Sequence, residues 1–264
     1  KQCKTVHVGF AGGMTLRSVA EKLAQHLNQK HPDNPDTLVF HAMVASFDED
    51  DFYADPNSFI TYFIGQNSNV KVRFVRLPLP GIIESARYSE LQQMPGIDTV
   101  FERRKEIQII VTSGSLWSDK HSTLRTYLNA ALDESQRRSG SDSTSGEERK
   151  QAFQLFKDKH VIGDLLWQPI NNEGPVRIDM AYRMSILMEL NELPEFIQTG
   201  GSILLVIGCS GISRRPKSEL LRTILDLHPK QNWVTDIVTD SPTVEGMYFP
   251  QIQNNMWRSP RQPK

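Results

Sequence analysis

The stretch VHVGFAGGMTLRSVAEKLAQHL, residues 6–27, places an apolar strand, a pair of glycines and an amphipathic helix in direct succession. After the glycines, apolar residues recur at helical spacing, at Leu16, Val19, Ala20, Leu23 and Leu27. Such a stripe is typical of a helix that packs on a sheet, and Thr15 is the expected N-cap. Strand, tight turn and helix in this order form the repeating unit of an α/β fold.

The same alternation continues along all 264 residues. Short β-branched or apolar runs, each expected to be a strand, occur at 5–10, 37–44, 70–75, 107–112, 202–208 and 233–238. Further helices are expected at 57–65 and 217–227. Strands alternating with helices predict a mainly parallel sheet covered by helices.

Three other segments bear on the domain organisation. The polar Ser/Gly tract at 135–149 is interpreted as a mobile loop, with an interdomain linker as the alternative. Residues 163–177 are expected to continue the sheet, with a hairpin turn at 171–174. We therefore favour one domain over two. The tail at 251–264 is expected to be irregular.

Composition excludes several classes of protein. Thirty Lys and Arg against 31 Asp and Glu give a net charge of −1, which provides no electrostatic footprint for nucleic acid or an anionic membrane. There is no apolar run of about 18 residues and no signal-peptide pattern. Cys3 and Cys209 are expected to be reduced thiols in a cytoplasmic protein. The chain starts at Lys1 without a Met, so we expect an excised fragment.

The glycine pair predicts an anion site. Gly12 and Gly13 let the backbone approach a ligand with φ > 0, so that amides at the helix start converge on a phosphate beside the Thr15 hydroxyl. The alternative is a glycine turn that only allows the strand and helix to pack closely. The sequence is neither a Walker A motif nor GxGxxG, which disfavours a nucleotide cofactor.

Two more glycine turns follow strands, at Gly114–Ser115 and at Gly208–Gly211. In a parallel sheet, all three turns meet at the carboxyl edge, where open α/β sheets bind ligands. Lys217 starts the next helix and can reach an anion there. Arg214 and Arg215 are interpreted as solvated loop residues.

Other candidates are weighed against structural roles. Asp164, beside an apolar run, must be paired, cap a turn or face a polar ligand. Asp55-Pro56-Asn57 is interpreted as a turn with a helix cap. His7 and His41 are interpreted as sheet residues rather than ligands, and no base accompanies Cys209. No catalytic pattern, metal-ligand spacing or cofactor motif occurs in the sequence.

Taken in order, these motifs resemble the C-terminal effector-binding domain of SorC-type bacterial transcription regulators, which are relatives of the DeoR group. They are VGFAGGMT, DPNS, VTSGS, VIGDLLWQPINNEGPV, VIGCSG with KSELLRTIL, and VTDIVTDSPTVEGM. The resemblance implies a three-layer α/β/α Rossmann-like domain over 1–264, similar to the sugar-phosphate isomerase, glucosamine-phosphate deaminase and CoA-transferase-like fold. It also implies an N-terminal helix-turn-helix domain that is absent from this chain.

The resemblance further implies a phosphorylated sugar as effector and no catalysis. The residues that would hold its phosphate are Gly12, Gly13, Met14, Thr15 and Lys217. Those that would contact the rest of the sugar are Asn57, Gly114, Ser115, Asp164 and Gly208. Such a sensor would assemble as a homodimer or homotetramer and bind operator DNA through the missing domain. The alternatives are a sugar-phosphate isomerase or deaminase that uses Asp164 and Lys217, and an interaction module without a ligand.

Overall fold

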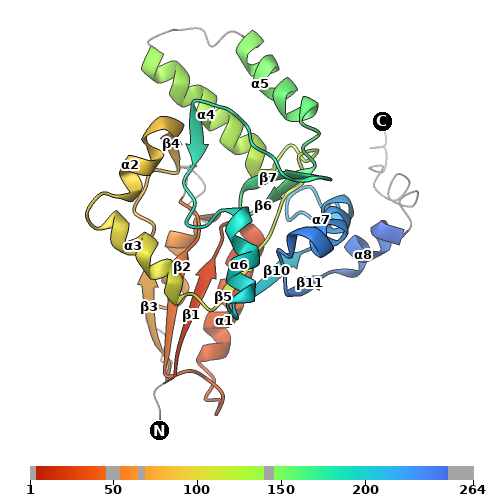
Figure 1. Ribbon diagram of the computed structural model, residues 1–264. Helices are drawn as coiled ribbons and strands as arrows, with labels where there is room; N and C mark the ends of the chain where they lie inside the picture. Colours follow the sequence, from red (N-terminus) through yellow and green to blue (C-terminus); the bar gives the residue numbers. More distant parts are fainter. Residues whose placement is uncertain (1–3, 46–53, 65–68, 140–145, 249–264) are drawn as a thin grey trace, which may run out of the picture.

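A six-stranded parallel sheet forms the centre of the computed structural model, which describes residues 4–45, 54–64, 69–139 and 146–248 (Figure 1). Its strands are β1 (Thr5–Phe10), β2 (Thr37–Ala42), β3 (Lys71–Val75), β5 (Ile109–Thr112), β10 (Ser202–Ile207) and β11 (Asp236–Thr239). All six predicted strands are present and parallel, with ends that differ by a few residues from the predicted ones. The expected α/β sheet is confirmed.

The strand order is β11-β10-β5-β1-β2-β3. The chain therefore builds the sheet outward from β1 in one direction, through β2 and β3, and then in the other, through β5. The loops that follow β1 and β5 diverge at this reversal and leave a crevice at the carboxyl edge, where doubly wound sheets bind ligands. The topology alone places a candidate site beside Gly12 and Gly114.

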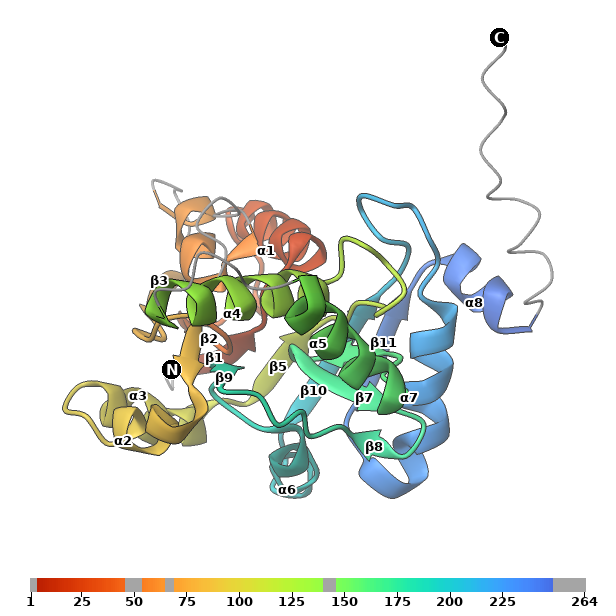
Figure 2. The ribbon, with the colours of Figure 1, turned by 90° about the horizontal axis from the view of Figure 1, so that it is seen from above.

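Helices cover both faces of the sheet (Figures 1 and 2). One face carries α1 (Met14–Leu27), and the other carries α3 (Ile97–Arg103) and α6 (Leu193–Gln198). The helix α1 buries the predicted apolar stripe through Leu16, Ala20 and Leu27. The remaining helices include α2 (Tyr88–Gln92), α7 (Ser218–Gln231) and α8 (Ser241–Tyr248), with the short 3-10 helices η2 (Pro56–Tyr62), η3 (Ser85–Arg87), η4 (Arg104–Glu106) and η5 (Leu190–Glu192). This arrangement confirms the three-layer α/β/α fold.

Two helices lie above the carboxyl edge, where a mobile loop was expected. The helix α4 spans Thr123–Ser139 and α5 spans Gly146–Asp158, so most of 135–149 is helical and residues 140–145 lie outside the described part. The prediction is wrong for 135–139 and 146–149, because it weighed only the polar composition of the tract. The rings of Phe153 and Phe156 on α5 pack against Trp117, with centroids 5.5 and 4.6 Å away, and this tertiary packing overrides composition.

Residues 163–177 were wrongly assigned to the central sheet. They form a separate antiparallel sheet of β6 (Gly163–Leu165), β7 (Gln168–Asn171) and β8 (Gly174–Pro175). The predicted turn at 171–174 is confirmed by the pairing of Asn171 with Gly174. A further pair, β4 (Ile82–Glu84) with β9 (Tyr182–Met184), was not anticipated. The strands are too short to produce a clear period in sequence.

Two predicted helix starts also require correction. Gly13, at φ +114°, is the N-cap of α1 and provides no side-chain cap, whereas Thr15 lies inside the first turn. The predicted helix at 57–65 is the 3-10 helix η2, which Asp55 caps by accepting a hydrogen bond from the Asn57 amide. The helix expected at 217–227 is α7, which has Lys217 as its N-cap and continues to Gln231.

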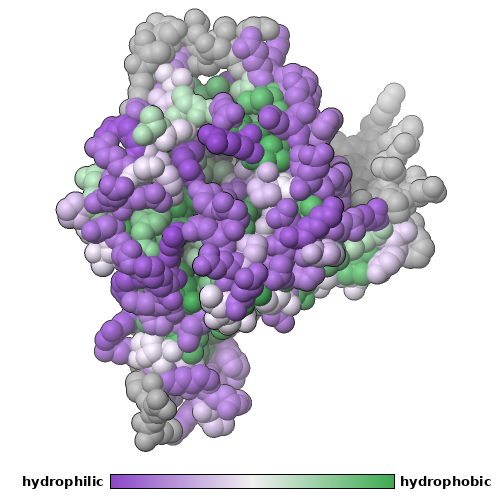
Figure 3. Space-filling model, viewed as in Figure 1, coloured by the Kyte–Doolittle hydropathy of each residue, from purple (hydrophilic) through white to green (hydrophobic). Residues whose placement is uncertain are grey.

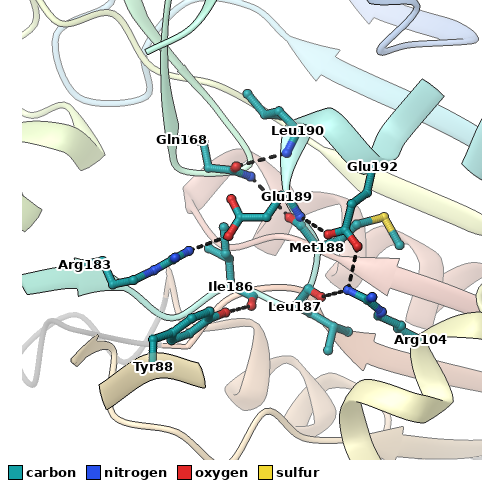
Figure 4. Close-up of polar contacts among 10 residues, drawn as sticks. All are labelled: Tyr88, Arg104, Gln168, Arg183, Ile186, Leu187, Met188, Glu189, Leu190 and Glu192. Atoms are coloured by element: carbon teal, nitrogen blue, oxygen red, sulfur yellow. Dashed lines mark hydrogen bonds and ion pairs between the residues drawn. The ribbon is translucent and has the colours of Figure 1, made fainter. Parts of the chain in front are cut away.

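A polar network fastens the segment between β9 and α6 to its surroundings (Figure 4). Arg183 pairs with Glu189 at 2.5 Å and lies over the Tyr88 ring, 3.9 Å from its centroid. The side chain of Gln168 donates to the Met188 carbonyl and accepts from the Leu190 amide.

Hydrophilic residues dominate the face that α2, α3 and α6 present (Figure 3). Among the described helices, none combines the length and apolarity that a membrane crossing needs.

Candidate functional site

A pocket of about 160 Å³ opens at the carboxyl edge of the sheet. It is smaller than the roughly 300–1,000 Å³ typical of pockets for drug-sized ligands, which suits a small polar compound. Five segments line it: the β1–α1 turn, the start of η2, the β5–α4 loop, the β6–β7 turn and the β10–α7 loop. The three glycine turns predicted to converge do lie around this one pocket.

The β1–α1 turn forms one wall. The Gly13 amide donates to the Ala54 carbonyl at 2.8 Å, so it is not available to a ligand in this conformation. The next amides, of Met14 and Thr15, belong to the first turn of α1, where amides have no acceptor within the helix. These two amides and the helix dipole favour an anion at this wall.

The Trp167 side chain packs against Gly12 of the β1–α1 turn and also lines the pocket. It lies in the two-residue turn between β6 and β7, in which Leu166 and Trp167 both have positive φ, 50° and 63°. This conformation is costly for non-glycine residues. A Cβ on Gly12 would come within 2.4 Å of the Trp167 ring, so Gly12 is required by the packing of this indole. Trp167 is only 7% exposed and borders the pocket.

Asp164 is held at the base of the pocket by Ser115. The carboxylate accepts hydrogen bonds from the Ser115 amide, at 3.0 Å, and from the Ser115 hydroxyl. That hydroxyl in turn accepts from the amide of Thr123, the first residue of α4. Gly114 allows this approach, because a Cβ there would lie 2.2 Å from the Asp164 carbonyl oxygen. Ser115 therefore orients the acid and is fully engaged itself.

Asp164 and Lys217 are both buried beside the pocket, and each influences the pKa of the other. Asp164 is 1% exposed, and its burial raises the pKa to about 6, against the hydrogen bonds from Ser115 and the attraction of Lys217. Lys217 is 8% exposed; its burial lowers the pKa, while Asp164, Asp119 and Asp240 oppose that shift. At neutral pH the carboxylate and the ammonium stabilise each other beside the pocket.

Replacing Asp164 by asparagine tests the raised pKa. Between pH 4 and pH 6 the folded chain keeps a proton on Asp164 that the unfolded chain has lost. The contribution of Asp164 to the free energy of unfolding therefore falls as pH rises, by up to about 1.4 kcal/mol per pH unit, and is constant above the folded pKa. Urea denaturation at several pH values should show the wild-type minus Asp164→Asn difference falling across this window. A flat difference would contradict the assignment.

A second acid bridges two of the loops. Asp119 accepts from the Ser213 hydroxyl at 2.6 Å and from the His121 amide at 3.0 Å. Burial opposes ionisation of Asp119, but these hydrogen bonds hold its pKa below the usual value. Arg215 adds a hydrogen bond to the Ser118 carbonyl, and both Arg214 and Arg215 are exposed, as predicted. The β10–α7 loop is thus tied to the β5–α4 loop beside the pocket.

The structure brings together most of the residues predicted to contact the effector. Those on the pocket lining are Gly12, Gly13, Met14, Thr15, Gly114, Ser115, Asp164 and Lys217. Asn57 is not among them: its amide group donates to Asp55 and its oxygen accepts from the Leu77 amide. Gly208 is also outside, and a Cβ there would lie 2.8 Å from the Asp240 carboxylate.

Sequence reasoning missed several residues of the lining, chiefly Asp55, Asp119, His121 and Trp167. Asp55 could have been predicted, because it belongs to the same Asp55-Pro56-Asn57 turn from which only Asn57 was chosen as a sugar contact. Asp119 and His121 lie further along the β5–α4 loop than the Gly114–Ser115 turn, in a stretch without periodicity, and no local sequence signal marked them. Cys209 has a raised pKa from burial and the nearby Asp240, so its thiol remains protonated.

Reversal of strand order, helices on both faces and a pocket at the carboxyl edge together define a doubly wound three-layer α/β/α domain. No protein-family model matches the sequence, and no curated protein is significantly similar to it. Several solved structures that share this fold are transcription regulators. The probable sor operon regulator of Shigella flexneri matches with a TM-score of 0.60 and 13% identity, over 91% of this chain and 79% of that one.

Two further structures give the same result. The full-length sorbitol operon regulator SorC of Klebsiella pneumoniae matches with a TM-score of 0.61 and 13% identity, over 91% of this chain and 64% of that one. The putative sugar-binding domain of a transcriptional repressor from Vibrio fischeri matches with a TM-score of 0.54 and 10% identity, over 97% and 83%. The chain spans less than two thirds of the full-length regulator. It has the fold of SorC-type regulators, as the resemblance of its motifs implied.

Proposed function

We propose that this domain binds a phosphorylated sugar and acts as the effector-sensing part of a transcription regulator. The observation that supports this most is the placement of two anion-favouring features around one small pocket: the first amides of α1 and the buried ammonium of Lys217. A phosphate between them would receive backbone hydrogen bonds and a charge-assisted one. The structure from Vibrio fischeri, which has the same fold and is described as a putative sugar-binding domain, supports a sugar as the rest of the ligand.

The charges around the pocket favour a monophosphate. Among its described lining residues, Lys217 is the single Lys or Arg, whereas Asp55, Asp119 and Asp164 are acids. One phosphate can be matched by Lys217 and the helix start. A second phosphate would meet carboxylates, which repel it, whereas sugar hydroxyls can donate to them. Asp55 and Asp119 are therefore the proposed hydroxyl acceptors, in place of Asn57 and Gly208.

The proposal includes the surroundings of the domain. A helix-turn-helix segment in a longer cytoplasmic protein would bind operator DNA, and the domain would assemble as a homodimer or homotetramer whose arrangement shifts on effector binding. The domain would bind its effector without catalysing a reaction. The full-length sorbitol operon regulator, which is longer than the part that this chain matches, supports a regulator with additional segments.

Thermal unfolding with a panel of sugar monophosphates, their unphosphorylated forms and inorganic phosphate tests the proposal. A ligand at 100 times its dissociation constant stabilises the folded state by about 2.7 kcal/mol. For a domain of this size that raises Tm by about 5–10 °C. We expect this shift from at least one sugar monophosphate and not from its unphosphorylated form. Product formation in the same samples would favour a sugar-phosphate isomerase or deaminase, and equal shifts from both forms would overturn the phosphate site.

A further inference from the structure

Three potential metal ligands meet on the sheet face that carries α3, away from the pocket. They are His7 on β1, His41 on β2 and Glu106 at the end of η4. Nδ1 of His7 lies 3.0 Å from Nε2 of His41 and 3.2 Å from a carboxylate oxygen of Glu106. All three ligand atoms lie within 4.8 Å of one another. The sequence placed both histidines in the sheet correctly, but it contained no sign that Glu106 joins them.

The three ligand atoms cannot all be satisfied by hydrogen bonds to one another, because too few protons lie between them. His7 Nδ1 faces both a carboxylate oxygen and His41 Nε2, and it can carry only one proton. If His7 Nδ1 is protonated, His41 Nε2 and Glu106 compete for that single hydrogen. If His41 Nε2 is protonated instead, the bare Nδ1 of His7 faces the carboxylate, and two lone pairs repel. A bound cation would satisfy all three atoms together.

Burial is the largest influence on the pKa values of both imidazole rings. Burial lowers the pKa of His41 to about 4, with further lowering by His7 and Arg103. The pKa of His7 is also lowered, again mainly by burial. Nδ1 of the fully buried His41 has no hydrogen-bond partner among the described residues. The cluster is therefore poorly satisfied by protons and by its protein neighbours.

The ligands are held by the fold rather than by flexible side chains alone. Both histidines lie on adjacent parallel strands whose register is set by the sheet. Glu106 ends η4, and η4 is anchored by Arg104, whose guanidinium contacts the Leu187 carbonyl at 3.3 Å and Glu192 at 2.9 Å (Figure 4). The Glu106 side chain is 42% exposed and that of His7 16%, so an ion can reach the cluster from solvent.

We propose that His7, His41 and Glu106 bind a divalent transition metal ion, with zinc as the best match. Two imidazole nitrogens and one carboxylate form a known zinc ligand set. Bonds of about 2.0–2.1 Å in tetrahedral geometry place ligand atoms about 3.3 Å apart, close to the two short distances in the cluster. The fourth position, on the solvent side, would be taken by water. The ion would link β1, β2 and η4.

Arg103 is the group that a metal must displace or share. Its guanidinium lies 3.0 Å from the Glu106 oxygen nearest His7, and its Nε also reaches the other oxygen of that carboxylate. A ligating carboxylate is commonly hydrogen-bonded in this way through its second oxygen. Because Arg103 is partly exposed, it can shift from one oxygen to the other without repacking the sheet.

The test titrates untagged protein with zinc chloride in competition with a chromophoric chelator. We expect one zinc per chain in the wild type, and binding at least about 100-fold weaker in Glu106→Gln and His7→Asn. His31→Ala is the matched control, because His31 lies near Asp33 at 3.6 Å on an exposed surface. It should bind zinc as the wild type does. Circular dichroism without metal verifies that each variant is folded.

Cobalt provides a second readout that depends on the ligands themselves. Cobalt(II) bound to the wild type should show the visible absorption of a four-coordinate site, and the Glu106→Gln variant should lose it. The proposal is overturned if the wild type binds no zinc, or if Glu106→Gln and His7→Asn bind it as tightly as His31→Ala. Neither result would affect the phosphate site, which shares no residue with this cluster.

Discussion

Replacement of Lys217 by methionine is expected to weaken binding of a sugar monophosphate about 100-fold and to lower the free energy of unfolding by about 3 kcal/mol. The affinity falls because the phosphate loses its charge-assisted hydrogen bond, which contributes about 1.5–3 kcal/mol. The stability falls because the buried carboxylate of Asp164 loses the electrostatic attraction of the Lys217 ammonium. Isothermal titration calorimetry measures the first effect and urea denaturation the second.

Arg215→Met is the matched control, since Arg215 is a basic residue of the same loop that is exposed to solvent. Its hydrogen bond to the Ser118 carbonyl lies on the surface, so the stability change should be within about 0.5 kcal/mol and the affinity should be retained. If both variants bind the sugar monophosphate equally well, Lys217 does not hold the phosphate.

Gly114→Ala is expected to destabilise the fold by about 3 kcal/mol, with a fall in Tm of about 10 °C. The new Cβ would lie 2.2 Å from the Asp164 carbonyl oxygen and 2.9 Å from the Leu220 side chain. The oxygen belongs to the backbone of β6, so relief requires β6 to move away from the β5–α4 loop. That movement also separates Ser115 from Asp164 and should weaken ligand binding.

Gly211→Ala provides the comparison for this substitution. Gly211 also lines the pocket, but a Cβ there would meet no atom within 4 Å. Its thermal unfolding should resemble that of the wild type. Equal melting temperatures for the two alanine variants would show that the close approach of Gly114 to Asp164 does not limit stability.

Much of the fold follows from the sequence because strands and helices carry local periodic signals. The six central strands and the stripe on α1 were predicted from apolar spacing alone, and the parallel order then placed the glycine turns at one edge. The hairpin turn at 171–174 was predicted, but the separation of β6, β7 and β8 from the central sheet, the β4–β9 pair and the helices α4 and α5 were not. Their formation depends on contacts such as Phe156 with Trp117, which join distant segments.

Prediction of the candidate site succeeded for residues whose role depends on backbone conformation. It failed for residues whose role depends on the direction of the side chain. Gly12 and Gly114 were identified from their turns, and both have the close neighbours that require glycine. Asn57 bonds to Asp55 and Leu77 instead of facing the pocket, and Gly208 lies against the Asp240 carboxylate outside it. Trp167 was missed because its position depends on a turn in which two non-glycine residues have positive φ. The sequence LLWQ contains no glycine or asparagine that would predict such a turn.

Titration of wild-type protein with the most stabilising sugar monophosphate and with the same sugar lacking its phosphate tests the proposal that the domain senses a phosphorylated sugar. Isothermal titration calorimetry should give one site per chain and at least about 100-fold tighter binding of the phosphorylated form, since the helix start and Lys217 would both contact the phosphate. Equal affinities for the two forms, or no binding of any sugar monophosphate, would contradict it.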